Sequence, residues 1–144
     1  MNKALGTWHY AKSFFEAGQI IKEYTEDKTS LLSPAYYLYG HAIELVLKSY
    51  LQTKGQSIDN LKKLGHDLKK ILNEADLLGL KDICALGTEE SEAIKTINPY
   101  YKGKEFEYLV TGFKSFPNLD FLHTATDTLL SKIGKHFRKK LLNK

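Results

Sequence analysis

Residues 33–55 read SPAYYLYGHAIELVLKSYLQTKG, and this stretch has the pattern of a central helix. Ser33 followed by Pro34 is typical of a helix start, because serine can cap a first turn and proline is tolerated within it. Gly55 is typical of a helix end. Apolar residues lie on almost every side between these points, so we expect a helix over residues 33–53 that other helices surround.

Four further helices are predicted around this one from apolar spacing and capping residues. They span residues 7–26 with Thr7 as the cap, 67–78 with Asp67 as the cap, 89–97 before Asn98 and Pro99, and 119 onward. Residues 100–116 lack helical spacing and predict an irregular or extended connector before the last helix. The expected fold is therefore all-α, a four- to five-helix bundle forming one domain over residues 1–144.

Composition sets limits on the class of protein. A chain of 144 residues can bury a core without disulfides or a structural metal, and Cys84 is its single cysteine. The first residues lack the apolar run of a signal peptide, and no stretch is long and apolar enough to span a membrane. We therefore expect a cytoplasmic protein with no membrane contact and no cofactor.

The predicted central helix carries one polar line. Tyr37, His41, Glu44, Lys48 and Gln52 recur at spacings of three and four residues, which places them on one face. Glu44 and Lys48 have the favourable order for an ion pair one turn apart. The line has two interpretations: an exposed strip with an intrahelical ion pair, or a buried polar pocket or subunit contact.

A second polar group follows at Gly65, His66 and Asp67. Asp67 is well placed to cap the next helix, and His66 lies just outside it. With His41 and Glu44 these residues include ligand types for zinc, but no H-E-x-x-H or Cys/His spacing is present. We therefore expect no metal site, and we take Tyr37, His41, Glu44, Lys48, His66 and Asp67 as candidate binding residues.

The last predicted helix is strongly basic. No acidic residue follows Asp127, and the basic side chains are Lys132, Lys135, Arg138, Lys139, Lys140 and Lys144. One interpretation is a solubilising end that matches the helix dipole, and the other is a surface for phosphate or nucleic acid. Arg138 is the only arginine among the 21 basic residues, which argues against a dedicated reader of bases.

The segment over 33–55, followed by LKKLGHDLKKILNEA at 61–75, resembles the core of the HEPN superfamily of helical-bundle domains. The family pattern AIELxLKxxL matches residues 42–51, and its GHDL turn matches residues 65–68. The segment PYYKGKEFEYLVTG at 99–112 is similar to the tyrosine-containing connector of many members. The resemblance implies a helical bundle that dimerises and is often encoded beside a nucleotidyltransferase in defence or toxin–antitoxin loci.

Many members of that family are metal-independent ribonucleases with an Arg-x4-6-His motif. This chain departs from the motif, because no histidine follows Arg138, and the pair Lys132 and His136 has the wrong cation and one spacer too few. A lysine supplies charge but not the planar fork of arginine. The resemblance therefore predicts no metal-independent RNA cleavage.

The leading functional hypothesis is a non-catalytic, HEPN-like interaction or ligand-binding module in a bacterial defence, stress or toxin–antitoxin system. We expect a homodimer, with a nucleotidyltransferase-type protein, RNA or a nucleotide as further partners. Aromatic residues of the first and last helices predict the contact between subunits. The alternatives are a ribonuclease with a degenerate site and an electrostatic nucleic-acid binder that uses the basic helix.

Overall fold

The computed structural model describes residues 2–24 and 32–143, and these residues form seven helices and no strand. Five of the helices have ten residues or more: α1 (Asn2–Tyr24), α2 (Leu32–Thr53), α4 (Leu68–Leu77), α6 (Thr88–Lys102) and α7 (Leu119–Leu142). Two are short, α3 (Ile58–Leu64) and α5 (Leu80–Ile83). The predicted all-α fold is confirmed, and the five longer helices agree with the predicted bundle.

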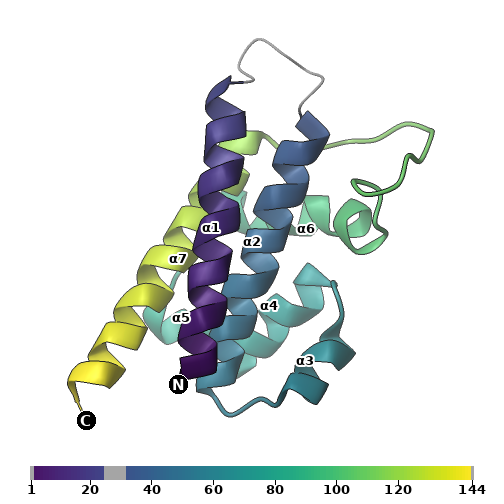
Figure 1. The fold of residues 1–144 in the computed structure, drawn as a ribbon. Helices are drawn as coiled ribbons and strands as arrows, with labels where there is room; N and C mark the ends of the chain where they lie inside the picture. Colours follow the sequence, from purple (N-terminus) through teal and green to yellow (C-terminus); the bar gives the residue numbers. More distant parts are fainter. Residues whose placement is uncertain (1, 25–31, 144) are drawn as a thin grey trace.

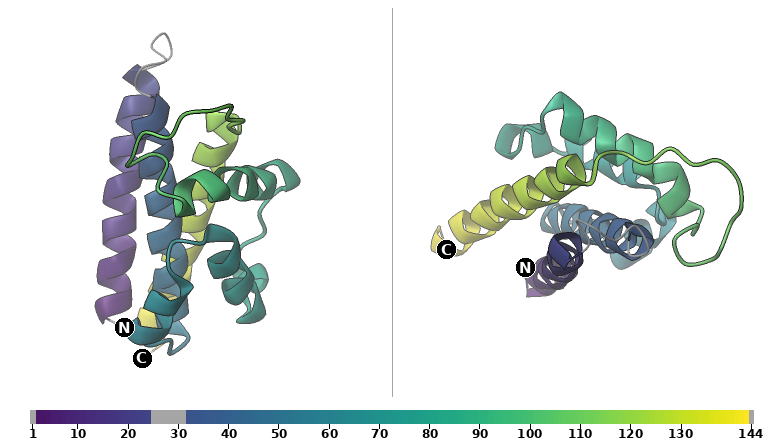
Figure 2. Two further views of the ribbon diagram at one scale, coloured as in Figure 1. Left: turned by 90° about the vertical axis from the view of Figure 1, so that its right-hand side faces the viewer. Right: turned by 90° about the horizontal axis from the view of Figure 1, so that it is seen from above.

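Helix α2 lies at the centre of the bundle. It runs antiparallel beside α1, while α7 and the α4–α6 region pack on its other sides (Figure 1). The view from above separates α1 and α2 from the layer that contains α4, α5 and α6, with α7 flanking both (Figure 2). Most of α2 is buried, including Glu44 and Ser49, as expected for a helix that is apolar on nearly all sides.

The helix starts differ from the prediction in α1 and α2. Helix α1 begins at Asn2, and Thr7 lies inside it and does not cap it: the Thr7 hydroxyl donates a hydrogen bond to the carbonyl of Lys3. Helix α2 begins at Leu32, so Ser33 lies in its first turn. The predicted end of the first helix at residues 25 and 26 lies outside the described residues.

Two helix boundaries lie where their capping residues predict them. Asp67 caps α4 by accepting a hydrogen bond from the backbone of Lys70, as predicted. Gly55 lies just after α2 with a φ of 85°, a conformation that glycine adopts without strain. The short helix α3, which was not predicted, is capped by Ser57.

The prediction that α6 ends before Asn98 and Pro99 is wrong, because the helix continues to Lys102 with Pro99 inside it. Proline normally breaks a helix because it lacks an amide donor and its ring crowds the preceding turn. Here Ile97, Asn98 and Tyr101 are all buried on both sides of the proline, so tertiary packing outweighs the local preference. This continuation positions Tyr101 against α2.

Residues 103–118 connect α6 to α7 without a helix or a strand. The predicted connector, residues 100–116, is thus confirmed from residue 103 onward, whereas residues 100–102 belong to α6. The connector loops away from the bundle before it returns to the start of α7 (Figure 1). Its two ends are held by an aromatic cluster in which Tyr36 of α2 contacts the rings of Phe106 and Phe116. The middle of the connector therefore projects from a fixed base.

Candidate functional site

The carboxylate of Glu44 is the centre of the polar line on α2. Its side chain is 4% exposed, and it accepts three hydrogen bonds. Lys48 Nζ lies 3.0 Å from Oε2, while His66 Nδ1 and the Tyr101 hydroxyl lie 2.8 Å and 2.7 Å from Oε1. Lys48 also donates to the carbonyl of Gly65 at 2.8 Å. The line is therefore a buried network that joins α2, α6 and the turn before α4, and we call it the Glu44 network.

His41 joins the network through Tyr101. The two side chains lie 2.9 Å apart between His41 Nδ1 and the tyrosine hydroxyl. Since that hydroxyl has one proton and donates it to Glu44, His41 must donate from Nδ1, which fixes its tautomer. Tyr37 stacks on the His41 ring at a centroid distance of 5.8 Å, and Phe14 packs against it edge-on. The polar chain thus runs from His41 through Tyr101 and Glu44 to His66 and Lys48.

Burial and hydrogen bonding set the protonation of these groups. Burial alone would raise the pKa of Glu44, but hydrogen bonds from Tyr101, His66 and Lys48 outweigh burial and lower it. The pKa of Tyr101 is raised well above its usual value, first by burial and then by the Glu44 charge. Burial lowers the pKa of His41. The network therefore contains an ionised carboxylate, a protonated phenol and a neutral His41 at neutral pH.

Asp67 is next to the network, because it follows His66 in the chain. Its carboxylate accepts the capping hydrogen bond and a second one from Asn98 Nδ2 at 2.9 Å. Asn98 Oδ1 in turn accepts from the amide of Leu68 at 2.7 Å. Lys102 lies 3.5 Å from the other carboxylate oxygen. These bonds attach the start of α4 to α6, so the geometry gives Asp67 a structural role.

Two side chains of the site were missed in the sequence. Tyr101 and Asn98 lie on either side of Pro99, in a segment that was assigned to a helix end and a connector. No local signal identifies their partners, which lie 57 and 31 residues away at Glu44 and Asp67. Only the packing of α6 against α2 and α4 brings them together.

The part of the Glu44 network that could take part in a reaction is its solvent-exposed edge. The His66 side chain is 49% exposed, and its Nδ1 lies 2.8 Å from Glu44 Oε1, so Nε2 is the ring nitrogen that can meet another group. A carboxylate that orients an imidazole in this way is the arrangement of a general base. No cluster of three or more possible metal ligands occurs in the part of the chain that the structure describes.

The basic residues of α7 separate into three environments. Lys132, Lys135 and Lys139 line a hollow with His136, Asp82 and Ile83, with a volume of about 320 Å³. Lys140 instead reaches α2, where its Nζ donates to the carbonyl of Thr53 at 3.3 Å. The predicted single positive face is therefore divided among different neighbours.

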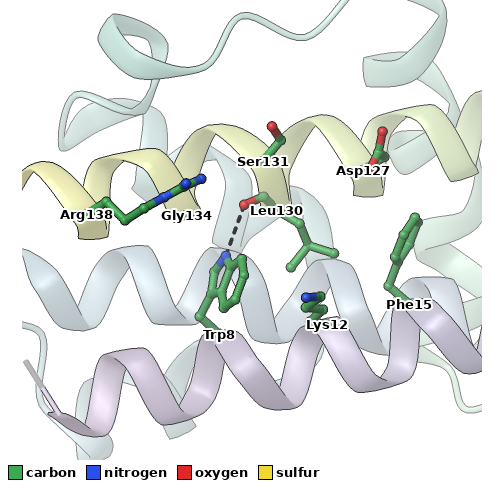
Figure 3. Close-up of a pocket in the computed structure, with 8 residues that line it drawn as sticks. All are labelled: Trp8, Lys12, Phe15, Asp127, Leu130, Ser131, Gly134 and Arg138. Carbon is green, nitrogen blue, oxygen red and sulfur yellow. Dashed lines mark hydrogen bonds between the residues drawn. The ribbon is translucent and has the colours of Figure 1, made fainter.

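Arg138 lies beside Trp8 on another side of α7. It lines a pocket between α1 and α7 together with Lys12 and Asp127, and the Trp8 indole donates to the carbonyl of Leu130 at 3.0 Å (Figure 3). Gly134 makes this contact possible, because a Cβ there would lie 2.9 Å from the indole ring. Arg138 thus has no place in the lysine-lined hollow.

The aromatic residues expected to form a subunit contact are largely inside the fold. Phe15 and Phe137 are buried, while Trp8, Phe14 and Phe121 pack against the core, and Tyr10 remains exposed. The expected exposed aromatic face of the first and last helices is therefore wrong. Among the residues that the structure describes, the longest run of exposed apolar side chains lies on the connector: Tyr108, Leu109, Val110 and Phe113.

Cys84 is buried, and burial raises the pKa of its thiol to about 11, so it is not a reactive nucleophile at neutral pH. None of the described helices is both long enough and apolar enough to cross a membrane. Comparison with protein-family models, curated proteins and solved structures gave no significant match.

Proposed function

We propose that this protein is a non-catalytic, HEPN-like interaction module that acts in the cytoplasm within a bacterial defence, stress or toxin–antitoxin system. The observation that carries the proposal is the exposed apolar part of the connector. Leu109 is 95% exposed and Phe113 is 97% exposed, and Tyr108 and Val110 lie between or beside them. Four such side chains within six residues are costly to leave in water and favour a protein contact.

The connector is well placed to link a partner to the Glu44 network. Its base is fixed by the aromatic cluster, and the amide of Ser115 donates to the Tyr100 hydroxyl at 2.8 Å. Glu107 of the connector lies close enough to Tyr37 to raise the pKa of that phenol, although burial contributes more. A protein bound at 108–113 would therefore lie next to the Tyr37 side of the network.

The partner that we propose is a second copy of the chain, with a nucleotidyltransferase-type protein as the other class suggested by the family resemblance. Sedimentation velocity at high micromolar concentration tests the homodimer. We expect a species near twice the monomer mass of 16.4 kDa, and a 16.4 kDa species for the double variant Leu109→Ser, Phe113→Ser.

The matched control is Leu77→Ser with Leu142→Ser, which removes two leucines that are also exposed, at the ends of α4 and α7. We expect this control to sediment like the wild type. A wild type that remains at 16.4 kDa, or a control that dissociates equally, would contradict the homodimer.

A second candidate function is a ribonuclease with a degenerate site. The observation in its favour is the pairing of exposed His66 with buried Glu44, which orients an imidazole as a base. Against it, the lysine nearest to this pair is already engaged, because Lys48 donates to both Glu44 and the carbonyl of Gly65. Lys48 is therefore not free to stabilise charge developing on phosphorus.

A further inference from the structure

The hollow between α5 and the second half of α7 has an unusual charge balance. Its lining contains three lysines, one carboxylate and one histidine: Lys132, Lys135, Lys139, Asp82 and His136. None of the four charged side chains forms an ion pair with any residue that the structure describes. With a neutral imidazole, the lining therefore has two positive charges in excess, and none of them is in an ion pair with a described residue.

The lining also contains a polar atom without a partner. His136 Nε2 is buried and makes no hydrogen bond to the described residues. The ring packs against Tyr50 at a centroid distance of 5.7 Å and lines the hollow together with the three lysines. Buried polar atoms in folded proteins are almost always paired, so an unpaired nitrogen at this place indicates that a water molecule or a ligand completes it.

The volume of the hollow and the side chains that line it limit which ligands it can hold. A volume of about 320 Å³ lies at the small end of the range of ligand sites. The lining has no phenylalanine, tyrosine or tryptophan side chain, so it lacks the large stacking platform that single-stranded nucleic acids use. Lysines act as point charges and bind phosphate without the planar match that arginine supplies.

The geometry points to a binding site for a phosphate group with two negative charges, as in inorganic phosphate or a small phosphate monoester, held by Lys132, Lys135 and Lys139. A monoester carries about −1.5 to −2 charges at pH 7, which matches the excess of the lining. A phosphodiester carries only one negative charge for each phosphate and would leave part of the excess positive charge of the lining uncompensated. This site shares no residue with the Glu44 network or the connector, so its test does not depend on the proposed function.

Titration with inorganic phosphate at constant ionic strength, followed by amide NMR shifts, tests the site. We expect saturable shifts at residues 82–83 and 132–139. The variant Lys132→Gln, Lys135→Gln, Lys139→Gln should bind at least about tenfold more weakly. The control Lys62→Gln, Lys63→Gln, Lys69→Gln removes the same charge from exposed lysines of α3 and α4 and should bind as the wild type does.

Neutralising the carboxylate within the hollow gives a second measurement. Asp82→Asn removes the single carboxylate and should tighten phosphate binding several-fold. Asp59→Asn is the matched control, because Asp59 also lies in the first turn of a short helix, α3. We expect no change in phosphate affinity for this control.

Three results of these titrations would overturn the site: shifts that do not saturate, equal weakening in the two lysine variants, or equal effects of the two aspartate variants. Glycerol phosphate and an RNA oligonucleotide serve as competitors. Displacement of phosphate by glycerol phosphate at similar concentration supports a monoester site. Displacement by RNA at far lower concentration would show a site for a nucleic-acid strand and contradict the inference.

Discussion

The hydroxyl of Tyr101 donates a hydrogen bond to Glu44 Oε1 across 2.7 Å, although 57 residues separate the two in the chain. The same hydroxyl accepts from His41, and the same carboxylate accepts from His66 and Lys48. Removing either side chain would therefore leave several polar groups of the network without a hydrogen-bond partner at once. The first two predictions follow from this arrangement.

Glu44→Ala should lower the free energy of unfolding by about 3–5 kcal/mol, because it leaves the partly buried ammonium of Lys48 without its counter-charge. The control Glu92→Ala breaks an exposed pair with Lys95 at 3.7 Å and should cost less than about 1 kcal/mol. Urea denaturation measures both. Equal losses in the two variants would mean that the Glu44 network adds no more than a surface ion pair.

Gly40→Ala should destabilise the protein by about 1–3 kcal/mol, although alanine is the better helix former. A Cβ at Gly40 would lie 2.6 Å from the Tyr101 ring, so the ring must shift from the position in which its hydroxyl bonds Glu44. Gly6→Ala is the control: nothing lies within 4 Å of its Cβ, and it should stabilise α1 by up to about 1 kcal/mol. Thermal unfolding compares them, and stabilisation by both substitutions would contradict the close packing of Tyr101.

Stability should fall as the pH is lowered from about 7 to 5. Burial lowers the pKa of His41, His123 and His136, so in each case the unfolded chain takes up a proton more readily than the folded protein. Their contribution to stability is thus present above the unfolded value of about 6.5 and is lost below it. The lowered pKa of Glu44 likewise makes stability fall as the pH falls, in the range below the ordinary pKa of 4.5.

Urea midpoints between pH 8 and pH 4 measure this dependence. The triple variant His41→Gln, His123→Gln, His136→Gln should show a smaller loss of stability between pH 7 and pH 5 than the wild type. A wild-type stability that stays constant or rises as the pH falls through this range would contradict the prediction.

Purified protein should not cleave RNA in EDTA. The reason is the missing Arg-x4-6-His motif together with the engagement of Lys48 by Glu44 and Gly65. The test incubates a pool of single-stranded and structured RNA with the wild type and, separately, with the variants His41→Ala, His66→Ala and His136→Ala. The RNA is then examined for new ends that cleavage would produce. Cleavage that survives EDTA and disappears in one variant would support the ribonuclease and identify its imidazole.

The sequence predicted the part of the site that depends on local spacing. The Glu44–Lys48 pair follows from their separation of one helical turn, and the Asp67 cap follows from its place before an apolar-periodic segment. The Glu44–Lys48 pair and the Asp67 cap need only the geometry of one helix and its neighbouring turn. The sequence left open whether the polar line is exposed or buried, so the burial of Glu44 and its contact with His66, 22 residues away, come from the packing of α2 against the turn before α4.

The rest of the site depends on contacts that local patterns do not encode. Pro99 predicts a helix end from backbone sterics, yet the burial of Tyr101 and Ile97 extends α6 past it. The charges of α7 appear as one basic face in the sequence. Their separation results from where α1, α2 and α5 dock: Arg138 beside Trp8, Lys140 at Thr53, and Lys132 across from Asp82.

The contact between Trp8 and Leu130 gives the chain a built-in optical reporter. Trp8 is the single tryptophan, and its indole bonds to a carbonyl 122 residues away on α7. Emission from this one fluorophore therefore follows the docking of α7 on α1, while far-ultraviolet circular dichroism follows helix content in the whole chain. Unequal midpoints from the two signals would reveal an intermediate in which the helices persist after α7 has detached.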